Sequence, residues 1–204
     1  VAKLRENPSL EFEARFGRLV GSRFEAGVTR VMIDRVIEMM SSSSHMQGDE
    51  WHEEQDFMYR DDSGATMRTR VTYCSETMNV HPETIKKNNV DNASFFIDQG
   101  LDDALALRVS LKEEVSVQNS PLCVPTEVVR IKQRRRFVTA DGHWAFDFAI
   151  AWSGKTKSEA EHKQSTTDPI FEIECELINS GEVLALHDDA RIATSLLLKM
   201  YQKF

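Results

Sequence analysis

Two runs of alternating glutamates, one near each end of the chain, constrain the fold more than any other feature of this sequence. The first run is Glu11-Phe12-Glu13, and the second is Glu172-Ile173-Glu174-Cys175-Glu176. Alternate residues of a β-strand share one face, so each run predicts a strand with glutamates on one side and apolar residues on the other. If the two strands lie side by side, their carboxylates repel one another, and a divalent cation between them relieves the repulsion.

The composition suits one globular domain, and we expect residues 1–204 to form it. The chain has 204 residues, of which 41% are hydrophobic, enough for a substantial core. Its net charge of −8 argues against a protein that coats nucleic acid or anionic membrane non-specifically. No apolar run approaches the roughly 20 residues that span a membrane, and no signal peptide is evident. We therefore expect no membrane partner and a location in the nucleus or the cytoplasm.

The apolar periodicity between the glutamate runs predicts a mainly antiparallel β-protein. A partner for the first glutamate strand is expected near residues 18–23. Further strands are expected at 51–60, 65–74, around 85–87, 108–117, 128–139 and 143–152. Asp61-Asp62-Ser63-Gly64 and Ala140-Asp141-Gly142 are turn sequences that join two pairs of these strands into hairpins. About eight strands with few helices favour an antiparallel barrel or sandwich.

Two segments have the three-to-four residue spacing of amphipathic helices, at residues 28–40 and 188–204. Residues 88–103 are less regular than a strand. Residues 153–168 are polar and lack any period, so we expect an exposed loop there.

Positive charge gathers on strands that lie between the two glutamate runs in the sequence. The longest alternating row consists of Arg130, Lys132, Arg134 and Arg136. Shorter rows elsewhere contain Arg68 and Arg70, and Arg108, Lys112 and Glu114, while Asp147 stands alone among alanines. These rows could be the solvated outer face of an ordinary sheet. However, such faces usually mix charge signs, since like charges on one face repel.

A closed barrel with the charged faces inward explains the segregation of charge. Its acidic strands would hold a hard cation such as Mg²⁺ or Mn²⁺, which carboxylate oxygens select. Its basic rows would hold a polyanion, because guanidinium groups bind phosphate oxygens in a bidentate manner. A metal beside rows of cations indicates a triphosphate ligand.

These residues resemble the metal-dependent RNA 5′-triphosphatases of fungi and protozoa, which belong to the triphosphate tunnel metalloenzymes. The resemblance rests on ExExRxG at residues 11–17, RxKxR at 130–134 and ExExE at 172–176, in that order over nearly the whole chain. The compact chain is most similar to the protozoan branch. The resemblance implies a mainly β fold, a closed antiparallel eight-stranded barrel or triphosphate tunnel, with a few flanking helices that include a C-terminal one.

The resemblance also implies roles for individual residues. Glu11, Glu13 and Glu176 would bind Mg²⁺ or Mn²⁺ directly, and Glu172 and Glu174 would hold its waters or assist the attacking one. The implied γ-phosphate contacts are Arg70, Lys132 and Arg134. Glu114 and Asp147 match two carboxylates of the family. The other implied substrate-binding residues are Arg15, Arg68, Lys86 or Lys87, Arg108, Lys112, Arg130 and Arg136. Ala145 and Ala149 depart from the family, whose members often carry a basic residue and a hydroxyl there.

The implied activity is hydrolysis of the γ-phosphate from triphosphate-ended pre-mRNA to give a 5′-diphosphate end, the first step of mRNA capping. Metal-dependent hydrolysis of nucleoside triphosphates would accompany it, a guanylyltransferase would be a partner, and the location would be nuclear. One alternative is the sister branch of the fold, whose members act on thiamine triphosphate or inorganic polyphosphate, or cyclise ATP. That branch usually has ExExK, where this chain has Arg15. Another alternative is a barrel that binds polyphosphate without cleaving it.

Overall fold

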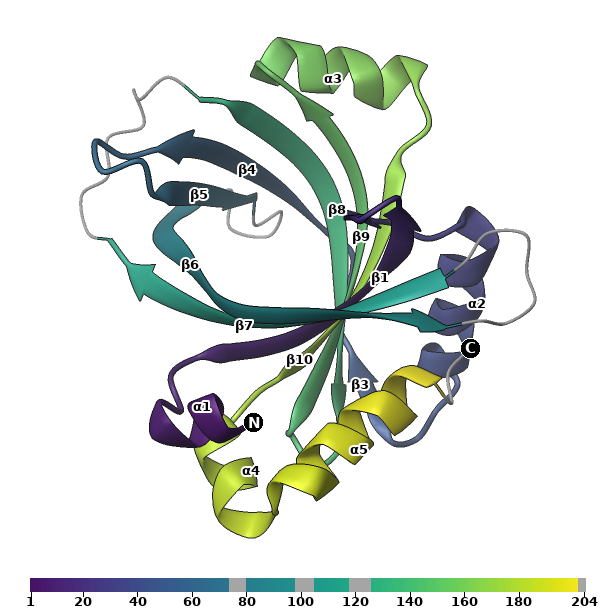
Figure 1. Ribbon diagram of the computed structural model, residues 1–204. Helices are drawn as coiled ribbons and strands as arrows, with labels where there is room; N and C mark the ends of the chain where they lie inside the picture. The colour runs from purple at the N-terminus through teal and green to yellow at the C-terminus, as the bar shows by residue number, and fades with distance from the viewer. Residues whose placement is uncertain (74–79, 98–104, 118–125, 202–204) are drawn as a thin grey trace.

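A computed structural model describes residues 1–73, 80–97, 105–117 and 126–201, and its strands form one antiparallel sheet that curls into a barrel (Figure 1). The strands of the barrel are β1 (Glu11–Val20), β4 (His52–Arg60), β5 (Thr66–Tyr73), β6 (Val80–Ile97), β7 (Leu105–Ser116), β8 (Val128–Thr139), β9 (Trp144–Gly154) and β10 (Ile170–Leu177). In the part of the chain described, these eight pair in the order β10-β9-β8-β4-β5-β6-β7-β1, and β1 also pairs with β10. The predicted closed eight-stranded antiparallel barrel is confirmed.

The first and last barrel strands close the sheet, and so the two glutamate runs lie side by side. In the β1–β10 pairing, Glu13 is opposite Glu176 and Arg15 is opposite Glu174. Two short strands extend the sheet: β2 (Arg23–Ala26) pairs with the carboxyl-terminal end of β1, and β3 (Met46–Gly48) pairs with β8.

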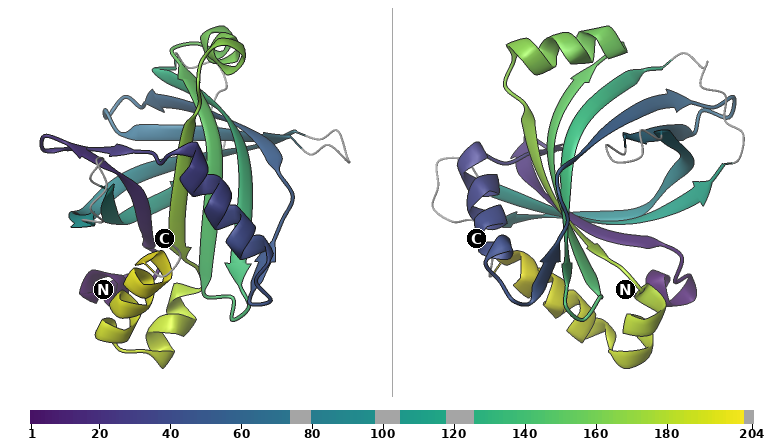
Figure 2. Two further views of the ribbon diagram at one scale, coloured as in Figure 1. Left: turned by 90° about the vertical axis from the view of Figure 1, so that its right-hand side faces the viewer. Right: turned by 180° about the vertical axis from the view of Figure 1, so that it is seen from behind.

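The apolar faces of the strands point outward, and helices cover them on the part of the barrel formed by β1, β8, β9 and β10. The helices are α1 (Ala2–Glu6), α2 (Arg30–Ser41), α3 (Lys157–Thr166), α4 (Ser180–Leu186) and α5 (Asp189–Tyr201), all outside the barrel in the three views (Figures 1 and 2). Phe12 and Phe16 of β1 and Ile173 of β10 join Ile33 of α2 and Leu196 of α5 in one buried cluster. Full burial of each such side chain contributes about 1.5–3 kcal/mol, so packing on this outer side turns the opposite, charged face inward.

Two expectations about regular structure were wrong. Residues 88–97 are not irregular, because β6 extends to Ile97 and pairs with β7 along this length; residues 98–103 lie outside the described part. Residues 153–168 contain helix α3 rather than a loop. The side chain of Thr156 accepts a hydrogen bond from the Glu159 backbone N–H, and Ala160 is fully buried against the sheet, which explains why so polar a segment is helical.

The amphipathic helix expected at residues 188–204 is α5, and α4 precedes it as a helix that the sequence analysis did not predict. Residues 202–204 of the expected helix lie outside the described residues. Within the described ranges, no helix combines the length and hydrophobicity that crossing a membrane requires.

Candidate active site

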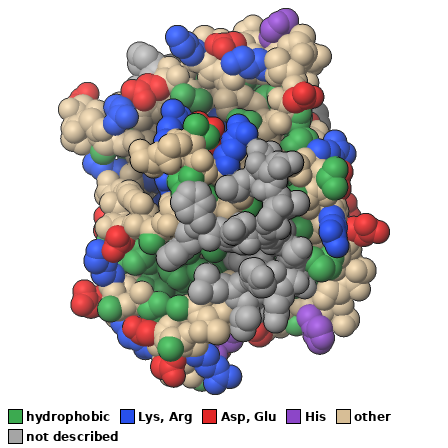
Figure 3. All heavy atoms as spheres, turned by 45° about the vertical axis from the view of Figure 1, so that its right-hand side comes forward, with side chains coloured by type: hydrophobic (Ala, Val, Ile, Leu, Met, Phe, Trp, Pro, Cys, Tyr) green, Lys and Arg blue, Asp and Glu red, His purple; other side chains and the backbone are tan. Residues whose placement is uncertain are grey.

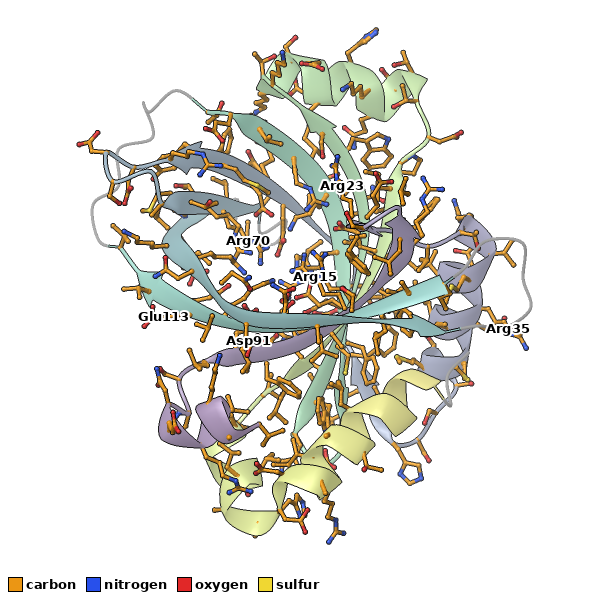
Figure 4. The ribbon with its side chains drawn as sticks, viewed as in Figure 1. Arg15, Arg23, Arg35, Arg70, Asp91 and Glu113 are labelled. Carbon is orange, nitrogen blue, oxygen red and sulfur yellow. The ribbon has the colours of Figure 1, made fainter. Side chains whose placement is uncertain are left out.

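The interior of the barrel, here called the lumen, is lined by charged side chains from most of its strands. In Figure 4, Arg15 of β1 and Arg70 of β5 lie in the lumen, whereas Glu113 and Asp91 lie on the outer side of β7 and β6. Strand alternation causes this division, since the residues that flank each inward side chain point to the covered face. The charged faces therefore point inward, as the sequence predicts.

Three carboxylates converge on one side of the lumen and form an acidic cluster, Glu11, Glu13 and Glu174. One oxygen of each lies within 4.8 Å of the others. Glu13 is only 1% exposed, and Lys112 and Arg15 both contact it, the latter at 3.2 Å. Three carboxylate oxygens at this spacing are a suitable donor set for Mg²⁺ or Mn²⁺, so the residues fit the predicted metal.

Without a bound metal, Glu11 and Glu13 of the acidic cluster hold protons up to near-neutral pH. Burial, together with the hydrogen bond and the charge of Glu174, raises the pKa of Glu13 to about 8. Burial, together with the charges of Glu114 and Glu174, raises the pKa of Glu11 to about 7. Burial also opposes the charge of Glu174, but Arg15 outweighs it and holds the pKa of Glu174 well below its usual range. A cation bound here would replace the protons on the first two residues.

The structure places Glu174 in the acidic cluster, where the sequence predicted Glu176. Glu176 instead accepts a hydrogen bond of 2.5 Å from Arg136, and burial raises its pKa. Glu172 likewise accepts a 2.6 Å hydrogen bond from Arg130. The metal-binding role of Glu176 stays a prediction, and so do the roles of Glu172 and Glu174 toward water.

A second cluster, the cationic cluster, consists of Arg70, Lys132 and Arg134 around two acids that the sequence analysis missed. Glu54 and Asp56 of β4 are each 2% exposed. Asp56 lies 2.9 Å from Arg70 and 2.6 Å from Lys132, while Glu54 lies 3.1 Å from Arg134. Burial opposes ionisation of Glu54, but the three cations outweigh it and lower its pKa to about 2. The alternation of Glu54 and Asp56 in a predicted strand was the signal that could have revealed them.

The remaining predicted residues are placed as follows. Arg134 and Arg136 lie 2.8 Å and 3.7 Å from Asp147, and Arg68 lies 3.9 Å from Glu114. Ala145 and Ala149 are buried beside them on β9.

Of the two lysines considered for the triphosphate, only Lys87 belongs to the lumen. Lys87 contacts Glu114 and lies 3.5 Å from Glu11. Lys86 is opposite Met67 on the outer face and lies 3.0 Å from Asp61 in the β4–β5 turn. Alternation along β6 separates the two, so Lys86 does not join the other candidate substrate-binding residues.

Comparison with solved structures places this barrel among known folds. The monoclinic mimivirus capping enzyme triphosphatase superimposes with a TM-score of 0.63 and 17% sequence identity, covering 100% of this chain and 94% of that one. The S. pombe Pct1 RNA triphosphatase gives a TM-score of 0.60 at 17% identity, over 85% of this chain and 72% of that one. The chain has the triphosphate tunnel fold. Pct1 bound to the Spt5 CTD matches similarly, with a TM-score of 0.62, 17% identity and coverage of 85% and 73%.

The similarity to RNA triphosphatases that the three motifs predicted is confirmed at the level of the tunnel fold. No family model and no curated protein sequence matches the chain. The assignment to the protozoan branch stays a prediction.

Proposed function

We propose that this chain is a metal-dependent RNA 5′-triphosphatase, which hydrolyses the γ-phosphate of triphosphate-ended pre-mRNA and leaves a 5′-diphosphate end. The observation that carries the proposal is the pair of clusters in one lumen. Glu11, Glu13 and Glu174 form the acidic cluster, and Arg70, Lys132 and Arg134 the cationic one. A polyanion that binds together with a divalent cation would contact both clusters.

The side chains of the cationic cluster are arranged to bind the γ-phosphate. Glu54 and Asp56 keep Arg70 and Lys132 in place, so that little reorganisation is needed when charge develops on the phosphoryl oxygens. Lys87 and Arg68 extend the positive surface along the lumen. A bound Mg²⁺ or Mn²⁺ would neutralise charge on the phosphate oxygens.

Water for the reaction would be oriented by glutamates of β10. Glu172 and Glu176 border the lumen and pair with Arg130 and Arg136. A carboxylate held by an arginine can accept a hydrogen bond from water in a defined direction. Hydrolysis would then release inorganic phosphate.

Recognition of the RNA end, rather than of its length, suits the charge distribution of the protein. The net charge is −8, and the coloured side chains of the face in Figure 3 show acidic and basic groups interspersed. The same lumen would accept the triphosphate of free nucleotides. A 5′-diphosphate end is the substrate that a capping guanylyltransferase requires, so we propose such an enzyme as a partner and the nucleus as the location.

The test is the release of inorganic phosphate from triphosphate-ended RNA, ATP, inorganic tripolyphosphate and thiamine triphosphate, with Mg²⁺ and with Mn²⁺. Glu13→Ala and Lys132→Ala should each lower kcat by roughly 10²–10³-fold, the loss typical of a preorganised charge. Glu113→Ala is the matched control, because Glu113 is on β7 beside Glu114 but faces outward, where Asn88 donates to it.

Three other results would argue against the proposal. A preference for thiamine triphosphate or tripolyphosphate would place the chain in the sister branch of the fold. Tight binding of triphosphate without release of phosphate would make it a non-catalytic binding barrel. Full activity of both lumen variants would show that the two clusters are not the site.

A further inference from the structure

A cavity of about 270 Å³ lies beside the acidic cluster, between β1, β2, β6 and β7. Glu13 belongs to both the cluster and the cavity lining, and Arg15 and Lys112, which contact Glu13, also line the cavity. Its other lining residues include Phe24, Asn89, Asn92 and Arg108. These groups are aromatic, amide and guanidinium in character, so this part of the lumen differs chemically from both charged clusters.

A bulge in β6 creates the amide side of the cavity. The pairing of β6 with β7 shifts between Asn89 and Asp91, so that Asn89 is opposite Lys112 and Asn92 is opposite Ser110. Without the shift, Asp91 would be the next inward side chain after Asn89. With it, Asp91 faces outward and pairs with Lys3 of α1 at 2.8 Å. The bulge thus replaces a carboxylate at the cavity with a neutral amide.

The opposite side of the cavity is a stacked pair. The Arg108 guanidinium lies 4.3 Å from the centre of the Phe24 ring. Phe24 reaches this position because Gly17 has no side chain; a Cβ there would lie 2.7 Å from the Phe24 ring and 2.2 Å from the Glu25 carbonyl oxygen. The pair offers a planar cationic surface on which a nucleobase can stack.

The cations at the border of the cavity are already engaged. Lys112 contacts Glu13, and Arg15 lies 3.0 Å from Glu174. Asn89 and Asn92 are neutral, and the Arg108 guanidinium lies against the Phe24 ring. The stacked pair and the two amides suit a nucleoside, which has the flat ring and the polar edges that these groups recognise.

We infer that the cavity binds the first nucleoside of the substrate, an inference that rests on the proposed triphosphatase function. The base stacks on Arg108, and Asn89 and Asn92 hydrogen-bond the edges of the base or the ribose. The triphosphate then runs from the cavity, past the acidic cluster, to the γ-phosphate contacts at the cationic cluster. This order gives the substrate one direction in the tunnel.

The test compares substrates with and without a nucleoside. In the double variant Asn89→Ala/Asn92→Ala, the KM for ATP and for triphosphate-ended RNA should rise about tenfold or more, as expected for loss of specific polar contacts to a base, with kcat nearly unchanged. The kinetics with inorganic tripolyphosphate should not change, since that substrate has no nucleoside. Asn88→Ala is the matched control, because Asn88 adjoins Asn89 but donates outward to Glu113.

Two results would overturn the inference: unchanged KM for the nucleoside substrates, or an equal effect on tripolyphosphate. Both results require an active wild-type protein, so they differ from failure of the proposed function, in which no substrate releases phosphate. If the wild type is inactive, binding is measured instead. Calorimetry with Mn²⁺ then gives the Kd of the non-hydrolysable β,γ-imido analogue of ATP and the Kd of tripolyphosphate, for the wild type and for the double variant. Weaker binding of the analogue alone in the double variant supports the nucleoside site; equal binding to variant and wild type refutes it.

Discussion

The acidic cluster should couple metal binding to the release of protons. Two unit charges at 4.8 Å, the upper limit of the oxygen spacing in this cluster, repel by about 3.5 kcal/mol at an effective dielectric constant of 20. Burial is the largest contribution, and together with the charges of Glu114 and Glu174 it outweighs the attraction of Lys87 and raises the pKa of Glu11 from 4.5 to about 7. Glu13, which is more deeply buried, reaches about 8. A divalent cation must therefore displace up to two protons at acidic pH and none at alkaline pH.

The apparent affinity for Mg²⁺ should accordingly rise steeply with pH and then level off. With pKa values of about 7 and 8, the association constant should increase by about 10³-fold from about pH 6 to about pH 9. By about pH 8 the association constant should have reached roughly half of its value at about pH 9. Calorimetric titration in two buffers with different ionisation enthalpies measures both the affinity and the number of protons released.

Glu13→Gln should remove one of the two titrating groups, so the protons released near neutral pH should fall by about one. Glu113→Gln, on the outer face of β7, should behave like the wild type. An affinity for Mg²⁺ that does not depend on pH, or binding without proton release, would refute the assignment of these carboxylates as metal ligands.

Three further predictions follow from the same contacts. Without metal, Glu13 keeps its proton in the folded protein, whereas the same group in the unfolded chain releases it above about pH 4.5. The Tm of the metal-free protein should therefore fall as pH rises from about 5 to 8. A Tm that rises over this range would contradict the raised pKa of Glu13. Glu54→Gln should lower the free energy of unfolding by about 1–3 kcal/mol, measured by urea titration, because it removes one charged partner while Arg70 and Lys132 keep Asp56 and Arg134 keeps Asp147. Gly17→Ala should cost about 1–3 kcal/mol through the clash with the Glu25 carbonyl oxygen and the Phe24 ring. Gly181→Ala, with nothing within 4 Å of the added Cβ, should leave stability nearly unchanged or slightly increased.

Some of the structure could be predicted from the sequence because it depends on local alternation. The inward and outward faces of β1, β8 and β10 follow from period-two patterns such as Glu11 to Arg15 and Arg130 to Arg136. The same patterns led to the closed barrel, since segregated charges need a shared interior. Helix α3 was missed because its polar sequence has no apolar stripe, and its helicity depends on the Thr156 cap and on Ala160 packing against the sheet.

The sequence by itself therefore determined which face each residue occupies in the regularly alternating strands β1, β8 and β10, and the tertiary structure decided which charges meet. Glu174 and Glu176 occupy the same face of β10, yet Glu174 joins the acidic cluster while Glu176 pairs with Arg136. Likewise, the bulge in β6 turns Asn92 inward and Asp91 outward. The physical reason is that the direction of a side chain is a property of one strand, whereas convergence depends on register between strands far apart in sequence, which appears only when the barrel closes.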